Sequence, residues 1–371
     1  MSYLKKIYLE NFRNYKQAQV IFSPKVNLLL GENGQGKSNI LESIYFLSLL
    51  RSFRTNRIRH LQSWRSQQML LRAHIEHDEK QEDILGIEYL KDKRKLRLNG
   101  DNVTRASQFI QQILGICFVP EDIELIKGSA SERRRFLNIT LSQFDPVYLQ
   151  ISHQYELALQ SRNKLLRKEN LSASVLAAFD QQLIEYGIQI FQVRYHFLKT
   201  YCPQLEDVVR HLYPENNQLQ LKYIPSGLDL HDENIDNGQS LAQQFKEQLQ
   251  QDFERDCKRG ITHSGPHRDE MAISLNGKLL QYFGSEGQCR LAAIALKIAK
   301  TNLIEQYTTP QTTVLLVDDV IGELDLRSRN AFFDFIQNKG QIFIAATEID
   351  SIPESLQPKI FHIRNGEISQ G

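Results

Sequence analysis

The fold is indicated most strongly by one stretch of the chain, Gly31-Glu32-Asn33-Gly34-Gln35-Gly36-Lys37-Ser38. This stretch matches G-x-x-x-x-G-K-[ST], a loop whose backbone N–H groups surround the phosphates of a nucleotide. Residues 26–30 before it form a short apolar run that is typical of a buried strand, and residues 38–47 after it carry apolar side chains at helical spacing. Because the positive end of that helix faces the loop, the three elements together predict a phosphate-binding site.

The last two residues of this loop have separate predicted roles. Lys37 is expected to reach the β- and γ-phosphates, and the hydroxyl of Ser38 is expected to hold Mg²⁺. An ordinary glycine-rich turn is the alternative, but it does not account for the Lys-Ser pair or for the strand and helix around it. We therefore predict that the chain binds ATP with Mg²⁺ and that the nucleotide contacts Gly31, Glu32, Asn33, Gly34, Gln35, Gly36, Lys37, Ser38 and Asn39.

A site of this kind also needs a carboxylate at the end of a second buried strand to hold the metal. The best candidate is Asp318, which follows the strand-forming run 313–317, with Asp319 directly after it. We predict that Asp318 is the Mg²⁺ ligand and that Asp319 orients the water used for hydrolysis, so that Lys37, Asp318 and Asp319 are the catalytic residues. Lys37 and Asp318 are 281 positions apart, so a large segment is inserted between the two motifs.

Composition narrows the classes of partner and compartment. Forty-five basic residues against 44 acidic residues give a net charge of +1, so any nucleic-acid surface must be local. The four cysteines have neither metal-site nor disulfide spacing. No apolar run approaches the roughly 18 residues of a membrane span, and the N-terminus lacks a signal-peptide core. We expect a soluble, cytoplasmic protein with no membrane partner.

The periodicity of the chain changes twice. Residues 3–30 and 69–98 alternate as strands do, whereas residues 131–212 have apolar side chains at helical spacing. The second region predicts two long antiparallel helices around a bend near 168–174. Residues 214–240 are polar and turn-rich, and a further helix is predicted over 241–258.

The strand and helix alternation returns after this helical region. Strands are predicted at 271–275, 313–317 and 341–346, helices at 286–306 and 327–337, and a final hairpin turns at Asn365-Gly366. The prediction is an α/β fold whose ATP-binding lobe is split into residues 1–125 and 259–371. Residues 126–258 form the helical arm between the two halves.

A second motif lies in the C-terminal half, where Ser285-Glu286-Gly287-Gln288 opens a predicted helix. Ser285 is a good N-cap, Gly287 lets a ligand approach, and a helix N-terminus attracts anions. Taken alone, this segment is explained better by a plain capped helix. Its position favours a functional motif, because the Asp pair follows 33 residues later and Gly322-Glu323-Leu324-Asp325 comes directly after that pair.

In this order, the loop, Ser-x-Gly-Gln, Asp-Asp and Glu-Leu-Asp resemble the ABC-type ATPase heads of the SMC-like group. In that group the Ser-x-Gly-Gln motif, called the signature, of one subunit caps the γ-phosphate held by the loop of the other. The resemblance therefore implies an ATP-dependent homodimer, with four residues acting across the interface: Ser285, Gly287, Gln288 and Asp325.

Further stretches resemble the RecF family of bacterial recombination mediators, from about residue 2 to 367. They are residues 9–15, 41–45, 51–55, 120–122, 133–137 and 263–269. The resemblance implies a weak DNA-dependent ATPase that dimerises on duplex or junction DNA. It also implies cooperation with RecR and RecO to place RecA on single-stranded gaps during gap repair and replication-fork maintenance.

Two positions differ from the wider ABC group. The acid after Asp318 is usually Glu, but here it is Asp319, which is shorter by one methylene. Where ABC heads carry a switch histidine, this chain reads Ala345-Ala346-Thr347-Glu348. Both substitutions also resemble RecF, and both favour slow hydrolysis, because general-base catalysis is sensitive to small displacements.

Local basic clusters are the candidate DNA contacts, since arginine and lysine bind phosphates without reading sequence. The alternative for each cluster is a solvated helix face or an internal salt bridge. For the first cluster, a contact with the dimer partner is a further alternative. His263 and His267 have a spacing that suits a metal, but no third ligand is evident, and the resemblance suggests a structural loop. The candidate DNA contacts are Arg51, Arg54, Arg57 and Arg59, then Arg133, Arg134 and Arg135, and at the arm tip Lys164, Arg167 and Lys168.

Three other classes compete with this interpretation. An SMC-type chromosome or DNA-break ATPase head is the main alternative, but it would need a much longer coiled coil between its halves. A transporter's nucleotide-binding subunit would need the Glu and the switch histidine that are missing here. A small-molecule kinase would leave the second motif without a purpose.

Overall fold

The computed structural model describes residues 2–370 except 79–80, 169–171, 214–216 and 308–311. The chain divides into two compact units. We call Met1–Asp122 with Ile294–Gly371 the split unit, and Ile123–Ala293 the inserted unit. The predicted arm ended at 258, but residues 259–293 group with the inserted unit because they supply strands that pair with it.

A six-stranded sheet forms the centre of the split unit, in the order β15-β14-β3-β13-β12-β8. All neighbours run parallel except the hairpin β14–β15, which turns at Asn365-Gly366, both with positive φ. Its inner strands are apolar runs, as expected where helices cover both faces of a parallel sheet. The strands are β3 (Val26–Leu30), β8 (Ile113–Phe118), β12 (Thr312–Asp318), β13 (Gln341–Ala346), β14 (Lys359–Arg364) and β15 (Glu367–Gln370).

Helix α1 (Lys37–Leu49) begins at the phosphate loop and is buried along nearly all of its length. It packs closely against β8 at Gly115, where a larger residue would not fit. A Cβ atom at that position would lie 2.1 Å from Ser48 Oγ. The sequence did not predict β8, although this strand forms one edge of the parallel sheet.

An antiparallel sheet in the order β2-β1-β4-β5-β6-β7 completes the β structure of the split unit. The amide of Gln341 in β13 ties this sheet to the parallel one. Its Oε1 accepts from Leu4 N at 2.8 Å, and its Nε2 donates to the carbonyl oxygens of Leu4 and Ser23. The strands are β1 (Tyr3–Phe12), β2 (Tyr15–Ile21), β4 (Gln68–Glu76), β5 (Glu82–Leu90), β6 (Lys93–Leu98) and β7 (Asp101–Val103).

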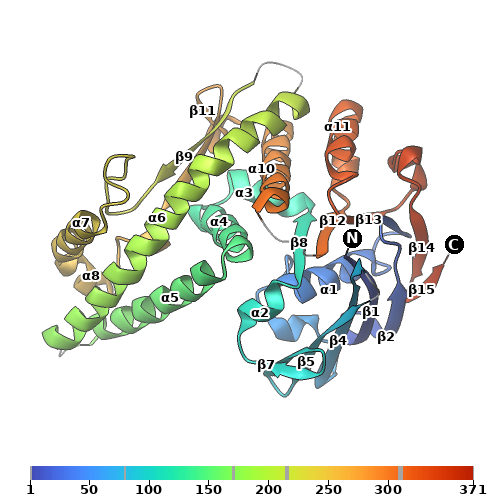
Figure 1. The fold of residues 1–371 in the computed structure, drawn as a ribbon, viewed down its shortest axis with the longest axis horizontal. Helices are drawn as coiled ribbons and strands as arrows, with labels where there is room; N and C mark the ends of the chain where they lie inside the picture. Colours follow the sequence, from blue (N-terminus) through green and yellow to red (C-terminus); the bar gives the residue numbers. More distant parts are fainter. Residues whose placement is uncertain (1, 79–80, 169–171, 214–216, 308–311, 371) are drawn as a thin grey trace. The chain divides into compact units, whose positions relative to one another are not determined.

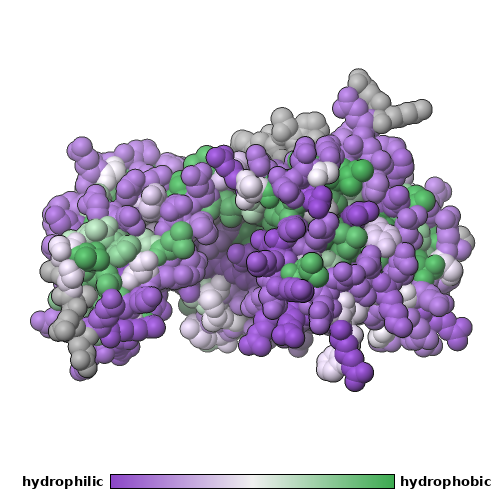
Figure 2. All heavy atoms as spheres, turned by 90° about the horizontal axis from the view of Figure 1, so that it is seen from below, coloured by the Kyte–Doolittle hydropathy of each residue, from purple (hydrophilic) through white to green (hydrophobic). Residues whose placement is uncertain are grey.

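Helices of varied length connect these strands. None of the described helices is long and apolar enough to cross a membrane, and hydrophilic residues predominate on the face shown in Figure 2. The helices are η1 (Ile58–Leu61), α2 (Ala106–Ile110), η3 (Pro120–Ile123), α10 (Glu286–Tyr307, in the split unit from Ile294), η5 (Val320–Glu323), α11 (Leu326–Ile336), η6 (Ile349–Ser351) and η7 (Glu354–Leu356).

The inserted unit is mainly helical, and its two longest helices, α5 and α6, lie side by side (Figure 1). Part of the predicted bend between them lies outside the described residues. The predicted helix over 241–258 is two helices that meet at Asp252. The helices are α3 (Glu124–Lys127), α4 (Ala130–Phe144), α5 (Pro146–Leu166), α6 (Ala173–Leu212), α7 (Gly238–Gln251), α8 (Phe253–Arg259), η4 (Pro266–Arg268) and α9 (Leu280–Phe283).

A three-stranded sheet, β11-β10-β9, completes the inserted unit. Strand β9 (Leu219–Ile224) was missed, because its alternating pattern lies in a polar, turn-rich region. It pairs with β10 (Glu270–Leu275), which also pairs with β11 (Lys278–Leu279). This pairing places the segment after residue 259 with the helical arm.

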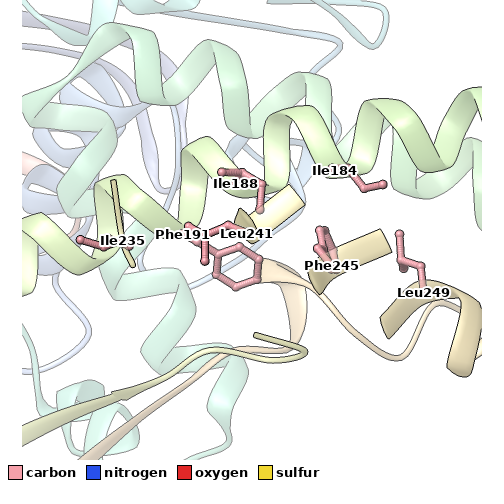
Figure 3. Close-up of a cluster of buried hydrophobic side chains, with 7 residues drawn as sticks. All are labelled: Ile184, Ile188, Phe191, Ile235, Leu241, Phe245 and Leu249. Carbon is pink, nitrogen blue, oxygen red and sulfur yellow. The ribbon is translucent and has the colours of Figure 1, made fainter. Parts of the chain in front are cut away.

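Helices α6 and α7 share a buried apolar core, shown in Figure 3. Gly187 allows the close approach of these helices, because a Cβ atom there would lie 2.9 Å from Phe245 Cε1. The core consists of Ile184, Ile188, Phe191, Ile235, Leu241, Phe245 and Leu249.

Candidate ATP site

The predicted phosphate loop connects β3 to α1. Gly34 and Gly36 have φ angles of 80° and 119°, a backbone region that side-chain-bearing residues rarely adopt. A Cβ atom at Gly31 would lie 2.4 Å from the carbonyl oxygen of Ile363 in β14. The loop pattern thus reflects both backbone conformation and close packing against the sheet.

Lys37 is buried and its ammonium group lies inside the loop. Its Nζ donates to the carbonyl oxygens of Gly31 at 2.6 Å and Glu32 at 2.9 Å. Burial lowers the pKa of Lys37, while the charges of Asp319 and Asp318 oppose that shift. The loop therefore holds one cation where phosphate oxygens would otherwise meet only backbone N–H groups.

Ser38 and Asp318 meet although 280 positions separate them in the chain. Strand β13 lies between β3 and β12, and all three parallel strands end at the same edge of the sheet. There Ser38 Oγ donates to Asp318 Oδ1 at 2.8 Å. The predicted pairing of the phosphate loop with the carboxylate at the end of the second buried strand is thus present in the structure.

This pair fits a magnesium ion, because Mg²⁺ prefers hard oxygen ligands such as a hydroxyl and a carboxylate. Burial raises the pKa of Asp318 to about 6, and the charge of Asp319 adds to the rise while the hydrogen bond from Ser38 opposes it. A cation at this position would favour the ionised carboxylate. When bound, Mg²⁺ would neutralise phosphate charge beside Ser38 and Asp318.

Asp319 differs from Asp318 in backbone conformation and in solvent exposure. Its carboxylate is exposed, and its φ of 51° and ψ of −1° place it in the left-handed region at the start of η5. Aspartate and asparagine tolerate this region better than most residues. The conformation therefore gives a physical reason for Asp, rather than the longer Glu, at this position.

Sequence reasoning missed the residues that support the loop from the β1–β2 turn. Tyr15 OH donates to the carbonyl oxygen of Gly36 at 3.0 Å, and Asn14 Nδ2 donates to that of Gln35 at 3.2 Å. Asn39, a predicted nucleotide contact, donates from Nδ2 to Asn14 Oδ1 and accepts from Arg54 at 3.0 Å. The available signal in the sequence was Asn14-Tyr15, which ends the first of the stretches that resemble RecF, residues 9–15.

The signature segment caps α10 through a reciprocal pair of hydrogen bonds. Ser285 Oγ accepts from Gln288 N at 3.2 Å, and Gln288 Oε1 accepts from Ser285 N at 3.0 Å. This arrangement is a capping box, in which two otherwise unpaired N–H groups are satisfied. Gly287 is exposed, with no atom within 4 Å of where its Cβ would be. The prediction that these residues act across a dimer interface is untested.

Asp325 also has a role within its own chain. Its Oδ1 accepts from Ser328 N at 3.0 Å and its Oδ2 accepts from Ser328 Oγ at 2.7 Å, so that it caps α11. These hydrogen bonds lower the pKa of Asp325. Its predicted role at a dimer interface stays a prediction.

The predicted DNA contacts differ sharply from one another. In the split unit all four arginines of the first cluster are exposed. None forms an ion pair with a described residue. These residues are Arg51, Arg54, Arg57 and Arg59.

The cluster that opens α4 favours the internal alternative, and for the buried Arg133 this corrects its selection as a DNA contact. Arg133 is buried and donates to both carboxylate oxygens of Glu270, at 2.6 and 2.8 Å. Arg134 donates to the carbonyl oxygen of Asp269 at 2.6 Å. Arg135 lies 3.8 Å from Glu132.

The two histidines do not assemble a metal site. His263 Nδ1 lies 2.7 Å from Asp256 Oδ1. His267 lies between Tyr155 OH at 2.8 Å and the carbonyl oxygen of Thr262 at 3.1 Å, and burial lowers its pKa to about 4. No group of three metal-ligating side chains occurs among the described residues. Both histidines join the loop after α8 to the arm helices.

Together, the mainly parallel sheet, the phosphate loop on α1 and the Ser38–Asp318 pair define a P-loop ATPase head of the ABC type. The family described as RecF/RecN/SMC N terminal domain matches residues 3–366, and the chain belongs to this family. Over 99% of its length, it is 35% identical to the DNA replication and repair protein RecF of Ligilactobacillus salivarius, covering 97% of that protein. It is 33% identical to RecF of an Exiguobacterium species, again over 99% of its length and 98% of the relative.

Solved structures agree with this assignment. The recombination mediator RecF of the RecFOR pathway, solved with ATP, matches with a TM-score of 0.90 and 30% identity. The match covers 100% of this chain and 98% of that one. An Smc head bound to a domain of ScpA matches with a TM-score of 0.55 and 16% identity, over 99% and 96% of the two chains, and shows the fold alone. The predicted fold class is confirmed: an SMC-like ABC-type head with a helical arm and, in the described residues, no long coiled coil.

Proposed function

We propose that this chain is an ATP-dependent DNA-binding mediator of recombination in gap repair and replication-fork maintenance. ATP with Mg²⁺ drives dimerisation on duplex or junction DNA, and slow hydrolysis releases the dimer. With RecO and RecR, the bound protein helps to place RecA on single-stranded gaps. It works in the cytoplasm, on the nucleoid when it is bound to DNA.

The observation that carries this proposal is the pairing of Ser38 with Asp318 beside the lysine of the loop. It brings the two distant halves of an ATP site together within one unit. The relatives that are named for DNA replication and repair, and the RecF structure solved with ATP, support the role in DNA metabolism.

The signature supports the step of dimerisation. Its hydroxyl is exposed at the N-terminus of a long helix, where an anion from outside the chain would be stabilised. Because a γ-phosphate is such an anion, a second subunit that carries ATP is the expected partner.

Two titrations test the proposal. ATP affinity is first measured at equilibrium for the wild type and for Lys37→Met, which removes the cation of the loop. Lys95→Met, at an exposed position of β6, is the control. We expect Lys37→Met to lose nucleotide binding and the control to retain it. DNA binding by the wild type is then measured with and without Mg·ATP, on gapped and uninterrupted duplex. A DNA affinity that is the same with and without Mg·ATP would contradict the proposed ATP-dependent DNA binding.

An SMC-type head is the second candidate function, because the same fold supports it. It would hold DNA through its own ATP cycle without RecR and RecO. A complex of the ATP-bound protein with purified RecR on gapped DNA favours the mediator. Its absence at micromolar concentrations of both proteins would favour the SMC-type head.

A further inference from the structure

Trp64 is the most exposed large apolar side chain among the described residues. Its side chain is 90% exposed, although exposing an indole to water is unfavourable. It lies in the segment between η1 and β4 of the split unit. It is also the only tryptophan of the chain.

The turn that carries Trp64 is closed by a hydrogen bond and held at Ser63. Ser66 N donates to the carbonyl oxygen of Ser63 at 3.0 Å, which closes a four-residue turn, and Arg65 within it has a positive φ of 66°. Ser63 N donates to Asn11 O at 2.8 Å, and Ser63 Oγ donates to Arg13 O at 2.7 Å. The indole is therefore presented by a backbone that is tied to the end of β1.

The turn lies in a stretch of the sequence that carries only positive charges. Between Glu42 and Glu76 the chain has six arginines and no acidic residue. Of these arginines, Arg65 is adjacent to Trp64, and Arg57 and Arg59 flank the start of η1; all three are exposed and form no ion pair with a described residue. This concentration is notable in a chain whose net charge is only +1.

A tryptophan that binds another protein usually lies within a larger apolar patch. Here its neighbours in the chain are serine, glutamine and arginine, and the nearest exposed large apolar residues along the sequence are Ile21 and Ile84. An isolated aromatic ring among cations instead matches single-stranded nucleic-acid sites. There arginines hold the phosphates while bases stack on aromatic rings.

We propose that Trp64 stacks on an unpaired base of DNA beside a duplex, while the flanking arginines hold the adjacent phosphates. Bases inside a continuous duplex have both faces covered by their neighbours, so only an unpaired or terminal base offers a face to the indole. Trp64 thus distinguishes gapped DNA from continuous duplex. This inference rests on the proposed function, because it assumes that the chain binds DNA.

The test uses the full chain with Mg·ATP and two labelled DNAs of equal length, one gapped and one continuous. Anisotropy of the label measures DNA binding, and the intrinsic emission of the single tryptophan reports on Trp64 alone. We expect gapped DNA to quench this emission strongly and continuous duplex to quench it weakly. Because stacking on an aromatic ring contributes measurably for each base, Trp64→Ala should weaken binding of gapped DNA by roughly 5- to 150-fold. Its affinity for continuous duplex should change less than about twofold.

Two further variants complete the test. Trp64→Phe should retain most of the affinity for gapped DNA, and Ile21→Ala, which truncates another exposed apolar residue, should bind both DNAs as the wild type does. Normal anisotropy with unchanged tryptophan emission, or Trp64→Ala that binds gapped DNA normally, would overturn this inference alone. Emission that responds to ATP-driven dimerisation but not to DNA would also overturn it, because Trp64 would then contact protein. Absence of any DNA binding by the wild type would overturn both this inference and the proposed function.

Discussion

Asp318 and Asp319 are adjacent in the chain but lie in different environments. Asp318 ends β12, is buried and accepts a hydrogen bond from Ser38, whereas Asp319 is exposed in a left-handed turn. A metal ligand needs a fixed position inside the site, and a group that orients water needs access to solvent and substrate. The two environments therefore match the two proposed roles.

Substitution by asparagine separates these roles, since it keeps the shape of the side chain and tolerates the left-handed turn. Asp319→Asn should retain ATP affinity and slow turnover by a factor on the order of 10²–10⁴. Asp318→Asn should weaken Mg·ATP binding itself. Both variants are measured by equilibrium titration and by ATP turnover. Wild-type turnover in Asp319→Asn, or equal loss of ATP affinity in both variants, would refute this division.

The pKa of Asp318 also predicts a dependence on pH. A raised pKa of about 6 means that the carboxyl group of the free protein takes up a proton as pH falls through 6. Since Mg²⁺ binds the ionised form, the affinity for Mg·ATP should fall by roughly tenfold per pH unit below that value. Titrations between pH 5 and 8 check this, with nucleotide in the absence of Mg²⁺ as the control. A flat profile for Mg·ATP would contradict the assignment of Asp318 as the ligand.

At the scale of elements, α1 is joined to two separate turns through Glu42. This carboxylate is fully buried. It accepts two hydrogen bonds of 2.7 Å from the guanidinium group of Arg13 and a further one from Ser52 Oγ. Arg13 belongs to the turn after β1, and Ser52 follows Arg51 at the start of the arginine-rich segment 51–59. One side chain of the phosphate-loop helix thus fixes two neighbours of the ATP site.

Breaking this pair should be costly. Glu42→Ala leaves the Arg13 guanidinium without its partner and should lower the free energy of unfolding by about 3–5 kcal/mol. Replacing both partners with apolar residues, as in Arg13→Met with Glu42→Leu, should cost less than the single change. Urea unfolding of the three proteins measures this difference. A single variant as stable as the double one would show that the pair does not hold these turns.

The sequence predicted elements well where the pattern was local. The phosphate loop, α1, β12, β13 and the last hairpin all follow from short-range periodicity or turn residues. Strand β9 was missed because its alternation is short and flanked by polar residues. An internal salt bridge was one alternative for Arg133, but its partner Glu270 could not be predicted because it is 137 positions away. The supporting contact of Asn14 with the loop also depends on tertiary structure. Long-range partners leave no trace in the local sequence pattern, so these contacts are evident only in the folded structure.

At the scale of the whole molecule, we propose that the ATP site is complete only when two chains meet. One chain would supply Lys37, Ser38 and Asp318 from its split unit, and the other would supply Ser285. In the structure Ser285 already caps α10, so a substitution that destroys the cap changes helix stability together with any contact between chains. A useful variant must keep the cap and change only the contact.

Ser285→Asp meets this requirement, because aspartate is as good an N-cap as serine but carries a negative charge. That charge would repel a γ-phosphate from a second chain. The decisive measurement is the molar mass in solution, by light scattering, of the wild type and Ser285→Asp at saturating Mg·ATP. We predict that the wild type shifts from 43.1 kDa to twice that mass, while Ser285→Asp binds ATP but stays at the monomer mass. A wild type that remains at 43.1 kDa with ATP bound, or a Ser285→Asp variant that dimerises equally well, would contradict it.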